Sequence, residues 1–348
     1  MNYKFAQSVI IAGGKGTRLG KFSDYQPKHI LPVLNSPLID YHIESLIERY
    51  APIRFSYSTS NKDFFDNYFL KFKELFEQNL LQPKTDTVMK GPIYPLIELL
   101  YDLETNDDFE DCIIGITGDM FGDIDIEEVR EFHEKQGRHI TLVATRTYPT
   151  SKACVFDVND DNSLRGFRRL DSISTENDLI NLGLYVAGPG LLKIIGTDLE
   201  SYKEDFIFDI LAQEGALTVY VNDEKAVNIN TPYNLLCANM GALKRLCKKH
   251  FQEACIDKEN VVLYGTGTQT DQDAIIRNSV LGNYVIINKR VKMKNVVVMD
   301  GCEIGRESEL NNVILGKNST VQPESKLENC VVHSDGSIKS MEIYYEFE

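Results

Sequence analysis

The sequence predicts an α/β domain built on a mixed, mainly parallel sheet, followed by a short β-helix. Two observations lead to this fold class. Up to about residue 235, short apolar runs alternate with segments whose apolar residues recur at helical spacing. After about residue 258, apolar residues recur every five or six positions instead. We therefore expect a first domain at residues 1–235, a linker helix at 236–258 and a repeat domain at 259–340 of the 348-residue chain.

The first domain is predicted to alternate strands and helices in order. Strands are expected at 8–12, 53–58, 112–117 and 140–145, and helices at 38–50, 63–79, 93–103 and 127–136. The run CIIGIT at 112–117 is apolar throughout, as expected for a strand buried on both faces. Alternating strands and helices build a parallel sheet with right-handed crossovers, and such sheets bind ligands beyond the carboxyl ends of their strands. The loops after the strands at 8–12 and 112–117 lie there.

The repeat domain is predicted from a row of apolar residues spaced by five or six positions. Three such steps make one triangular coil of a β-helix, so the row indicates about three coils. A string of β-hairpins is the alternative, but hairpin strands alternate with a period of two. The row consists of Leu281, Ile287, Met293, Met299, Ile304, Leu310, Leu315, Val321, Leu327 and Val332.

A glycine-rich loop with nearby cations follows the first strand. Its glycines are Gly13, Gly14 and Gly16, and Arg18 and Lys28 come soon after. Glycines let backbone N–H groups approach phosphate oxygens closely, and the two cations add charge to a polyphosphate site. The spacing fits neither the dinucleotide fingerprint nor the P-loop. A tight turn from strand to helix is the structural alternative.

The sequence around this loop resembles the signature of the sugar-1-phosphate nucleotidyltransferases. The matching strings are GGKGTRLG at residues 13–20 and QPKHILPVLNSPLIDYHIESL at 26–46. The family includes mannose-1-phosphate guanylyltransferase and glucose-1-phosphate adenylyltransferase. The resemblance implies a Rossmann-like domain followed by a left-handed β-helix of hexapeptide repeats. It also implies that a nucleoside triphosphate and a sugar-1-phosphate react, with Mg²⁺, to give an NDP-sugar and pyrophosphate.

The resemblance assigns roles to residues at matching positions. Arg18 is expected on the β- and γ-phosphates, and Lys28 on the α-phosphate and the incoming phosphate. Asp119, after the 112–117 strand, is expected to hold Mg²⁺ and to complete the catalytic set with Arg18 and Lys28. The expected nucleotide-binding residues are Ala12, Gly13, Gly14, Gly16, Thr17 and Gly91.

The sugar-phosphate side of the site departs from the family pattern. The string INLGLYV resembles the family's N-x-G-x-Y strand, which assigns Asn181 and Gly183 to the sugar. Arg169 stands where the family has a phosphate-binding lysine, and a solvated strand edge is the alternative role for it. Asn228 replaces the aspartate that is the family's second metal ligand, and it retains only a neutral carbonyl oxygen. In the base-recognition segment at 90–96, Gly91 is retained while bulkier residues replace the family's small ones. The nucleobase and the sugar are therefore left open.

Charge and composition restrict the classes of partner. The net charge is −15, which disfavours binding to nucleic acid. The chain shows neither a secretory signal nor an apolar stretch of membrane-spanning length, so we expect a cytoplasmic protein that binds no membrane. Seven cysteines without C-x-x-C spacing indicate reduced thiols rather than a zinc site. The β-helix is expected to mediate a homo-oligomer. Because of Asn228 and the altered 90–96 segment, a non-catalytic regulatory or assembly subunit is the alternative function.

Overall fold

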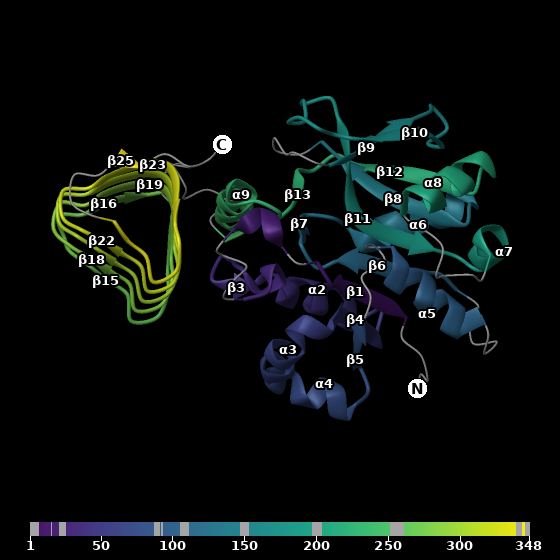
Figure 1. Ribbon diagram of the computed structural model, residues 1–348, viewed down its shortest axis with the longest axis horizontal. Coiled ribbons are helices and arrows are strands. Elements are labelled where there is room, and N and C mark those ends of the chain that lie inside the picture. Colours follow the sequence, from purple (N-terminus) through teal and green to yellow (C-terminus); the bar gives the residue numbers. More distant parts are fainter. Residues whose placement is uncertain are drawn as a thin grey trace. The chain divides into compact units, whose positions relative to one another are not determined.

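The chain forms two compact units in the computed structural model. The structure describes residues 7–14, 16–20, 26–86, 91, 93–104, 111–146, 153–196, 204–250, 261–338 and 343–344. The first unit comprises residues 1–14 and 39–228, and the second comprises 15–38 and 229–348. The predicted fold class is confirmed, because the first unit holds a mixed sheet with helices and the second holds the parallel coils of a β-helix (Figure 1).

The first unit is organised around one nine-stranded sheet. Its main path runs in the order β10-β9-β11-β6-β1-β4-β5, with β8 paired to β11 and β12 paired to β8. Strands β6, β1, β4 and β5 are mutually parallel, whereas β11 runs antiparallel to β6, β8 and β9. The bounds are β1 (Ser8–Ala12), β4 (Ile53–Ser58), β5 (Leu81–Asp86), β6 (Ile113–Thr117), β8 (Ile140–Thr145), β9 (Cys154–Val158), β10 (Leu164–Arg169), β11 (Leu179–Ala187) and β12 (Leu217–Asn222).

The helices of this unit follow the predicted order. Their bounds are α2 (Leu38–Ile47), α3 (Lys62–Tyr68), α4 (Lys73–Glu77), α5 (Tyr94–Glu104), α6 (Ile126–Gln136), α7 (Leu191–Ile195) and α8 (Glu204–Gln213). One expectation is wrong, because the single helix at 63–79 is interrupted by a 3₁₀ turn at Phe69–Phe72. Phe69 packs there against Phe55 of β4 with 4.8 Å between ring centroids, so tertiary aromatic packing accompanies the break in helical geometry.

Helix α6 begins as its sequence predicts. The Asp125 carboxylate accepts hydrogen bonds from the backbone N–H groups of Glu127 and Glu128 at 3.0 and 3.2 Å. It therefore caps the helix.

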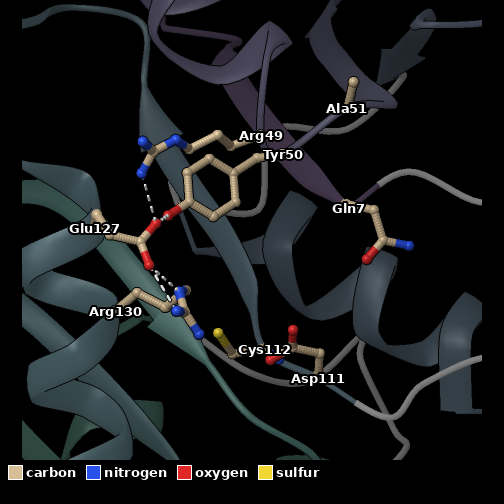
Figure 2. A pocket seen from close by; sticks show the side chains of 8 residues that line it. All are labelled: Gln7, Arg49, Tyr50, Ala51, Asp111, Cys112, Glu127 and Arg130. Atoms are coloured by element: carbon tan, nitrogen blue, oxygen red, sulfur yellow. Dashed lines mark hydrogen bonds and ion pairs between the residues drawn. The ribbon is translucent and has the colours of Figure 1, made fainter.

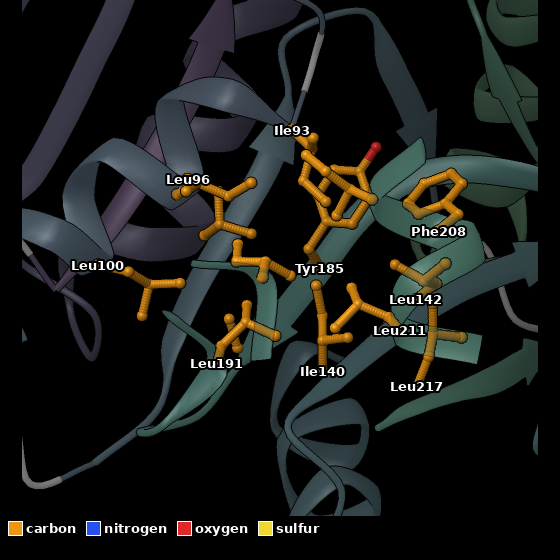
Figure 3. Packing of buried hydrophobic residues seen from close by; sticks show 14 of the residues in the cluster. Ile93, Leu96, Leu100, Ile140, Leu142, Tyr185, Leu191, Phe208, Leu211 and Leu217 are labelled. Atoms are coloured by element: carbon orange, nitrogen blue, oxygen red, sulfur yellow. The ribbon is translucent and has the colours of Figure 1, made fainter. Parts of the chain in front are cut away.

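The main core of the first unit lies between the sheet and helices α5, α7 and α8 (Figure 3). Leu96 of α5, Leu142 of β8 and Phe208 of α8 are fully buried around Tyr185 of β11. A Cβ atom at Gly115 would lie 2.9 Å from Leu96 Cδ1, so the glycine on β6 allows α5 to approach the sheet closely. Burial of each such side chain contributes about 1.5–3 kcal/mol.

The second unit contains the β-helix, helix α9 (Pro232–His250) and a small hairpin of β2 (Pro32–Val33) and β3 (Ser36–Pro37). The described strands of the β-helix are β14 (Val262–Tyr264), β15 (Gln269–Thr270), β16 (Ile275–Arg277), β17 (Ser279–Leu281), β18 (Ile286–Ile287), β19 (Lys292–Val298), β20 (Glu303–Ile304), β21 (Glu309–Leu315), β22 (Thr320–Val321), β23 (Lys326–Val332), β24 (Ser337–Ile338) and β25 (Ile343–Tyr344). Figure 1 shows their coils as stacked triangles.

Each coil of the β-helix advances by 17 residues. Ile287, Ile304, Val321 and Ile338 are successive partners across the parallel strands, and the asparagine bonds between neighbouring coils have the same separation of 17. Steps of six, six and five residues produce this repeat, as the apolar rhythm indicates. Met299 is the one misplaced member of the predicted row. Val298 lies in register between Leu281 and Leu315 and belongs to the interior cluster.

A second apolar row of the β-helix is buried outside that interior cluster. Val280, Val297, Ile314 and Val331 are at most 3% exposed, and each alternates with a neighbour that belongs to the interior. Helix α9 packs against β17, β19 and β21, the strands that carry three of these residues. The helix expected to be a linker therefore belongs to the same compact unit as the β-helix.

Two further observations concern the described part of the chain as a whole. None of its helices combines the length and apolarity needed to cross a membrane. Within it, Cys112, Cys154, Cys237, Cys302 and Cys330 are free thiols.

Candidate active site

Gly13 and Gly14 of the glycine loop share one edge of the first unit's sheet with Asp119. Strands β1 and β6 are parallel neighbours, with Ile11 opposite Thr117. The backbone N–H of Gly118 donates to the Ile11 carbonyl oxygen at 2.8 Å, so the pairing extends to the end of both strands. Gly13 and Gly14 follow β1, and Asp119 follows β6. Parallel pairing therefore brings these predicted nucleotide and metal residues together, as the strand order indicates.

Asp119 and Asn228 supply two oxygen donors at this edge. The short strands β7 (Met120–Gly122) and β13 (Ala226–Asn228) pair antiparallel, with Asn228 opposite Met120. The Asp119 side chain is almost buried, at 9% exposure. Asn228 Nδ2 donates to the Asn181 carbonyl oxygen at 3.1 Å, which orients the amide. Asn228 Oδ1 is buried and accepts no hydrogen bond among the described residues.

This donor set fits a hard divalent cation. An uncommitted buried carbonyl oxygen is costly unless a ligand satisfies it, and Mg²⁺ prefers oxygen ligands and completes its shell with water and substrate phosphate. Among the described residues there is no cluster of three His, Cys, Asp or Glu side chains that could hold a metal by itself. A metal here would therefore depend on Asp119, Asn228 and the phosphates of a substrate.

A bulge in β11 brings Asn181 and Gly183 to the same edge. The β11 register shifts between Asn181 and Tyr185 where the strand leaves β8. Asn181 Oδ1 accepts the backbone N–H of Gly183 at 3.0 Å. Gly183 has φ of +79°, and a Cβ atom there would lie 2.3 Å from Thr117 Oγ1. Glycine is required at this position for steric reasons, independently of any sugar. The structure thus groups Asp119, Asn228, Asn181 and Gly183.

Arg169 and Gly91 lie instead around Glu204, the first residue of α8. Arg169 Nη2 is 2.8 Å from Glu204 Oε2 and 2.5 Å from Asp205 Oδ1. The Tyr185 hydroxyl donates to Glu204 Oε1 at 3.4 Å, and a Cβ atom at Gly91 would lie 3.8 Å from Glu204 Cβ. Burial raises the pKa of the Glu204 carboxyl above its ordinary value, and Arg169 offsets part of that shift. A phosphate bound by Arg169 would compete with these two carboxylates.

Arg168, the neighbour of Arg169, is likewise ion-paired, with Asp178 as its partner. Both arginines are exposed on β10, at the end of the main strand path, and both form ion pairs there.

The remaining predicted residues belong to the second unit. Gly16 has φ of 67° and precedes the 3₁₀ turn Thr17–Leu19. Within that turn Leu19 is buried at 1% exposure, while Thr17 and Arg18 are exposed. The buried leucine anchors the turn and leaves the arginine on its surface.

Lys28 is held in place by a side chain that the sequence did not single out. It begins the 3₁₀ turn Lys28–Ile30 and is 8% exposed. Its Nζ donates to Asn230 Oδ1 at 2.9 Å, across 202 residues of sequence. Asn230 is missed because a contact of such separation leaves no local signal. The one available hint is its place two residues after Asn228 in the string NIN at 228–230.

A separate cavity of about 330 Å³ lies in the first unit at the opposite ends of these strands (Figure 2). Its lining includes Gln7 and Cys112, which directly precede β1 and β6. Glu127 accepts from Tyr50 at 2.8 Å and pairs with Arg130 at 2.6 Å and Arg49 at 3.3 Å. The charged groups thus neutralise one another, and this cavity contains none of the predicted site residues.

Comparisons with known proteins show the family to which this chain is similar. The nucleotidyl transferase family matches residues 7–228, and the GMPPB C-terminal domain matches residues 258–344. A protein of Sulfolobus acidocaldarius, provisionally named a mannose-1-phosphate guanyltransferase, is 26% identical over 287 residues, which are 79% of this chain and 75% of that protein. The mannose-1-phosphate guanylyltransferase catalytic subunit beta of Danio rerio is 25% identical over 223 residues, 61% of this chain and 57% of that subunit.

Two further likenesses extend the comparison. The glucose-1-phosphate cytidylyltransferase of Salmonella typhimurium is 22% identical over 237 residues, 62% of this chain and 87% of that protein. A solved structure from Bacillus anthracis is provisionally described as a glucose-1-phosphate thymidylyltransferase. It aligns with a TM-score of 0.55 at 18% identity, over 68% of this chain and 94% of that one, so the two share a fold. The family match over most of the first unit confirms the resemblance seen in the sequence. The chain therefore belongs to the nucleotidyl transferase family, among the enzymes that act as sugar-1-phosphate nucleotidyltransferases.

Proposed function

We propose that this protein joins a nucleoside triphosphate to a sugar-1-phosphate in a Mg²⁺-dependent reaction that yields an NDP-sugar and pyrophosphate. The observation that carries the proposal is the pairing of β1 with β6, which sets Gly13 and Gly14 beside Asp119. Backbone N–H groups and a carboxylate at one edge suit a polyphosphate and its metal ion.

The reaction needs little acid–base chemistry. An oxygen of the sugar-1-phosphate attacks the α-phosphorus, the bond to the β-phosphate bridging oxygen breaks, and pyrophosphate leaves with its electron pair. The attacking oxygen is already an anion at pH 7, so no proton has to be removed. The barrier arises mainly from repulsion between two polyanions, and positioning together with neutralisation of charge lowers it.

Several charged residues would contribute to that neutralisation. Lys28 would neutralise the α-phosphate, and Arg18 the leaving β- and γ-phosphates. Asp119 and Asn228 would hold Mg²⁺, which when bound screens the phosphate charges.

The substrates named for the relatives are the first candidates for the sugar and the nucleobase of this protein. The names of the relatives include mannose-1-phosphate guanylyltransferase and glucose-1-phosphate cytidylyltransferase. GTP with mannose-1-phosphate and CTP with glucose-1-phosphate are therefore the first pairs to assay, followed by the other nucleoside triphosphates.

Pyrophosphate release by purified protein, with and without excess EDTA, tests the proposal. Lys28→Met keeps the buried alkyl stem and removes the ammonium, and Asp119→Asn removes one metal ligand charge. We expect each variant to lose at least about a hundredfold in kcat/KM, as is common for a lost electrostatic contact. Lys292→Met, which removes an exposed lysine of the β-helix, is the control and should be unchanged.

Two results would overturn the proposal. Activity like that of the wild type in Lys28→Met or Asp119→Asn would remove its mechanism. Inactivity of the wild type with every pair of substrates would favour the non-catalytic subunit instead.

We also propose that two copies associate through the β-helix. Among the described residues, Tyr264, Ile275, Tyr284 and Ile286 expose 42–69% of their surface on its first coils. Large exposed apolar groups gathered on one element are typical of interfaces. Light scattering should show a dimer or larger species that dissociates in Tyr284→Ser, and a monomeric wild type at micromolar concentration would contradict this.

A further inference from the structure

The hairpin of β2 and β3 turns through two residues with left-handed backbones. Leu34 has φ of 49° and Asn35 has φ of 64°, and they connect Val33 to its partner Ser36. Asn and Gly suit such a turn, whereas a leucine there is strained by about 1–2 kcal/mol. Contacts from outside the hairpin must therefore stabilise the conformation of Leu34.

Asn239 in the middle of α9 supplies those contacts. Its Oδ1 accepts the backbone N–H of Leu34 at 2.9 Å, and its Nδ2 donates to the Pro32 carbonyl oxygen at 3.2 Å. The second hydrogen of Nδ2 bonds to the Leu235 carbonyl oxygen at 3.0 Å within the helix. Asn239 is completely buried, and all of these bonds belong to the second unit. One amide thus binds both a donor and an acceptor of the hairpin.

The β-helix holds the other side of the same turn. Asn35 Nδ2 donates to the Leu281 carbonyl oxygen of β17 at 2.7 Å. Helix α9 in turn packs on β17, β19 and β21. The turn is therefore bonded to α9 through Leu34 and to the β-helix through Asn35.

A short path of backbone bonds connects this hairpin to Lys28. The N–H of Leu38, just after β3, donates to the Leu31 carbonyl oxygen at 3.2 Å, and the N–H of Leu31 donates to the Lys28 carbonyl oxygen at 3.1 Å. The ammonium of Lys28 is bonded to Asn230, which lies two residues before α9 begins. Both the backbone and the side chain of Lys28 are thus tied to the region of α9.

We propose that Asn239 is a positioning residue for Lys28, and that α9 and the β-helix thereby take part in catalysis. The inference rests on the proposed function, in which the Lys28 ammonium neutralises the reacting α-phosphate. Asn239 itself touches no substrate. It fixes the conformation of the hairpin, and the hairpin fixes the position of the segment that carries Lys28. Because a displacement of about 1 Å at a reacting group can lower a rate a hundredfold, one clamp of this kind is enough to control turnover.

The first experiment compares Asn239→Ala with Asn234→Ala in steady-state pyrophosphate release. Asn234 is also fully buried on α9, and neither of its side-chain amide atoms has a hydrogen-bond partner among the described residues. The same substitution on the same helix therefore removes hydrogen bonds to the hairpin only in Asn239→Ala. We expect kcat to fall about 10- to 100-fold in Asn239→Ala, with KM for the nucleotide changed less than about threefold. Asn234→Ala should keep a kcat within about twofold of the wild type.

A double variant separates positioning from general damage to the fold. In the Lys28→Met background, Asn239→Ala should lower the residual rate by less than about twofold, because the group that it positions is already gone. The loss of thermal stability from Asn239→Ala should be the same in both backgrounds. A merely structural role would lower the rate equally in both.

Asn35→Gly tests the β-helix side of the clamp without straining the turn, because glycine accepts the left-handed backbone. We expect kcat to fall about three- to tenfold. This variant also decides the matter if Asn239→Ala does not fold.

Unchanged kcat in folded Asn239→Ala, or equal losses of rate in the two backgrounds, would overturn the inference while the wild type remains active. An inactive wild type would instead remove the proposed function on which the inference rests.

Discussion

Replacing Gly183 by alanine should destabilise the first unit through two separate effects. The backbone at Gly183 has φ of +79°, a conformation that costs a residue with a Cβ atom about 1–2 kcal/mol. The new Cβ would lie 2.3 Å from Thr117 Oγ1 and 2.7 Å from Thr117 Cγ2. Such overpacking in a buried site costs about 1–3 kcal/mol. The expected loss in the free energy of unfolding is therefore about 2–4 kcal/mol, allowing for partial relaxation.

Urea unfolding of Gly183→Ala beside Gly166→Ala measures this loss. Gly166 lies on β10 of the same sheet, and a Cβ atom there would meet nothing within 4 Å. Gly166→Ala should change stability by no more than about 0.5 kcal/mol. Agreement of the two variants within that margin would refute the steric reasoning.

A double variant divides the loss into its two parts. Thr117→Ala removes the two atoms nearest to the new Cβ and leaves only Thr117 Cβ, at 3.0 Å. In that background, Gly183→Ala should cost little more than the backbone share of about 1–2 kcal/mol. If the cost stays the same, the collision with Thr117 is not its cause.

Three further predictions concern charge. Asn228→Asp adds a negative charge to the metal donors, so Mg²⁺ should bind at least about tenfold more tightly, or by about 1.4 kcal/mol. A Mg²⁺ titration followed by thermal unfolding measures this, and an unchanged dependence on Mg²⁺ would contradict the assignment of Asn228 as a metal ligand. Arg169→Ala should lower the free energy of unfolding by about 1–3 kcal/mol at pH 8 and by less at pH 5. Burial raises the pKa of Glu204, and without Arg169 its carboxylate must take up a proton to stay buried, which is easier at the lower pH. Urea unfolding measures both losses, and equal losses at the two pH values would count against this. Burial lowers the pKa of His133 from 6.5 to about 4. As the pH falls, the unfolded chain therefore takes up a proton first, and stability decreases between pH 6.5 and 4 by about 3 kcal/mol at most. His133→Gln should reduce this decrease in thermal unfolding, and an unchanged decrease would show that other groups cause it.

Local patterns predicted β1, β4, β6 and β8 of the first unit and the helices that follow them, but not α7, α8 or the strands β5, β9, β10 and β12. The apolar run at 8–12 becomes β1, and the helical spacing after Leu38 becomes α2. Such patterns succeed because the buried face of a strand or helix is recorded in the spacing of a few adjacent apolar residues. The placement of Asp119 beside Gly13 follows by the same logic, once the strands before them are taken as parallel.

Predictions that required partners distant in sequence were less complete. Arg169 was weighed as a phosphate ligand or a solvated edge residue, and its pairing with Glu204 and Asp205 from α8 was not foreseen. The expected helix at 63–79 is interrupted where Phe69 packs on Phe55. Neither partner could be found from the neighbouring sequence, because the fold alone brings these segments together.

The sequence by itself determined the fold class, the first alternating strands and helices, the coil repeat and the family. Those features depend on the periodicity of apolar residues and on short motifs, which are properties of adjacent residues. Only the tertiary structure decided that Lys28 bonds to Asn230, that no described residue donates a hydrogen bond to Asn228 Oδ1, and that Asn239 bonds to the hairpin at Leu34. A hydrogen bond between residues two hundred positions apart depends on where packing places the two backbones, and no local pattern contains that information.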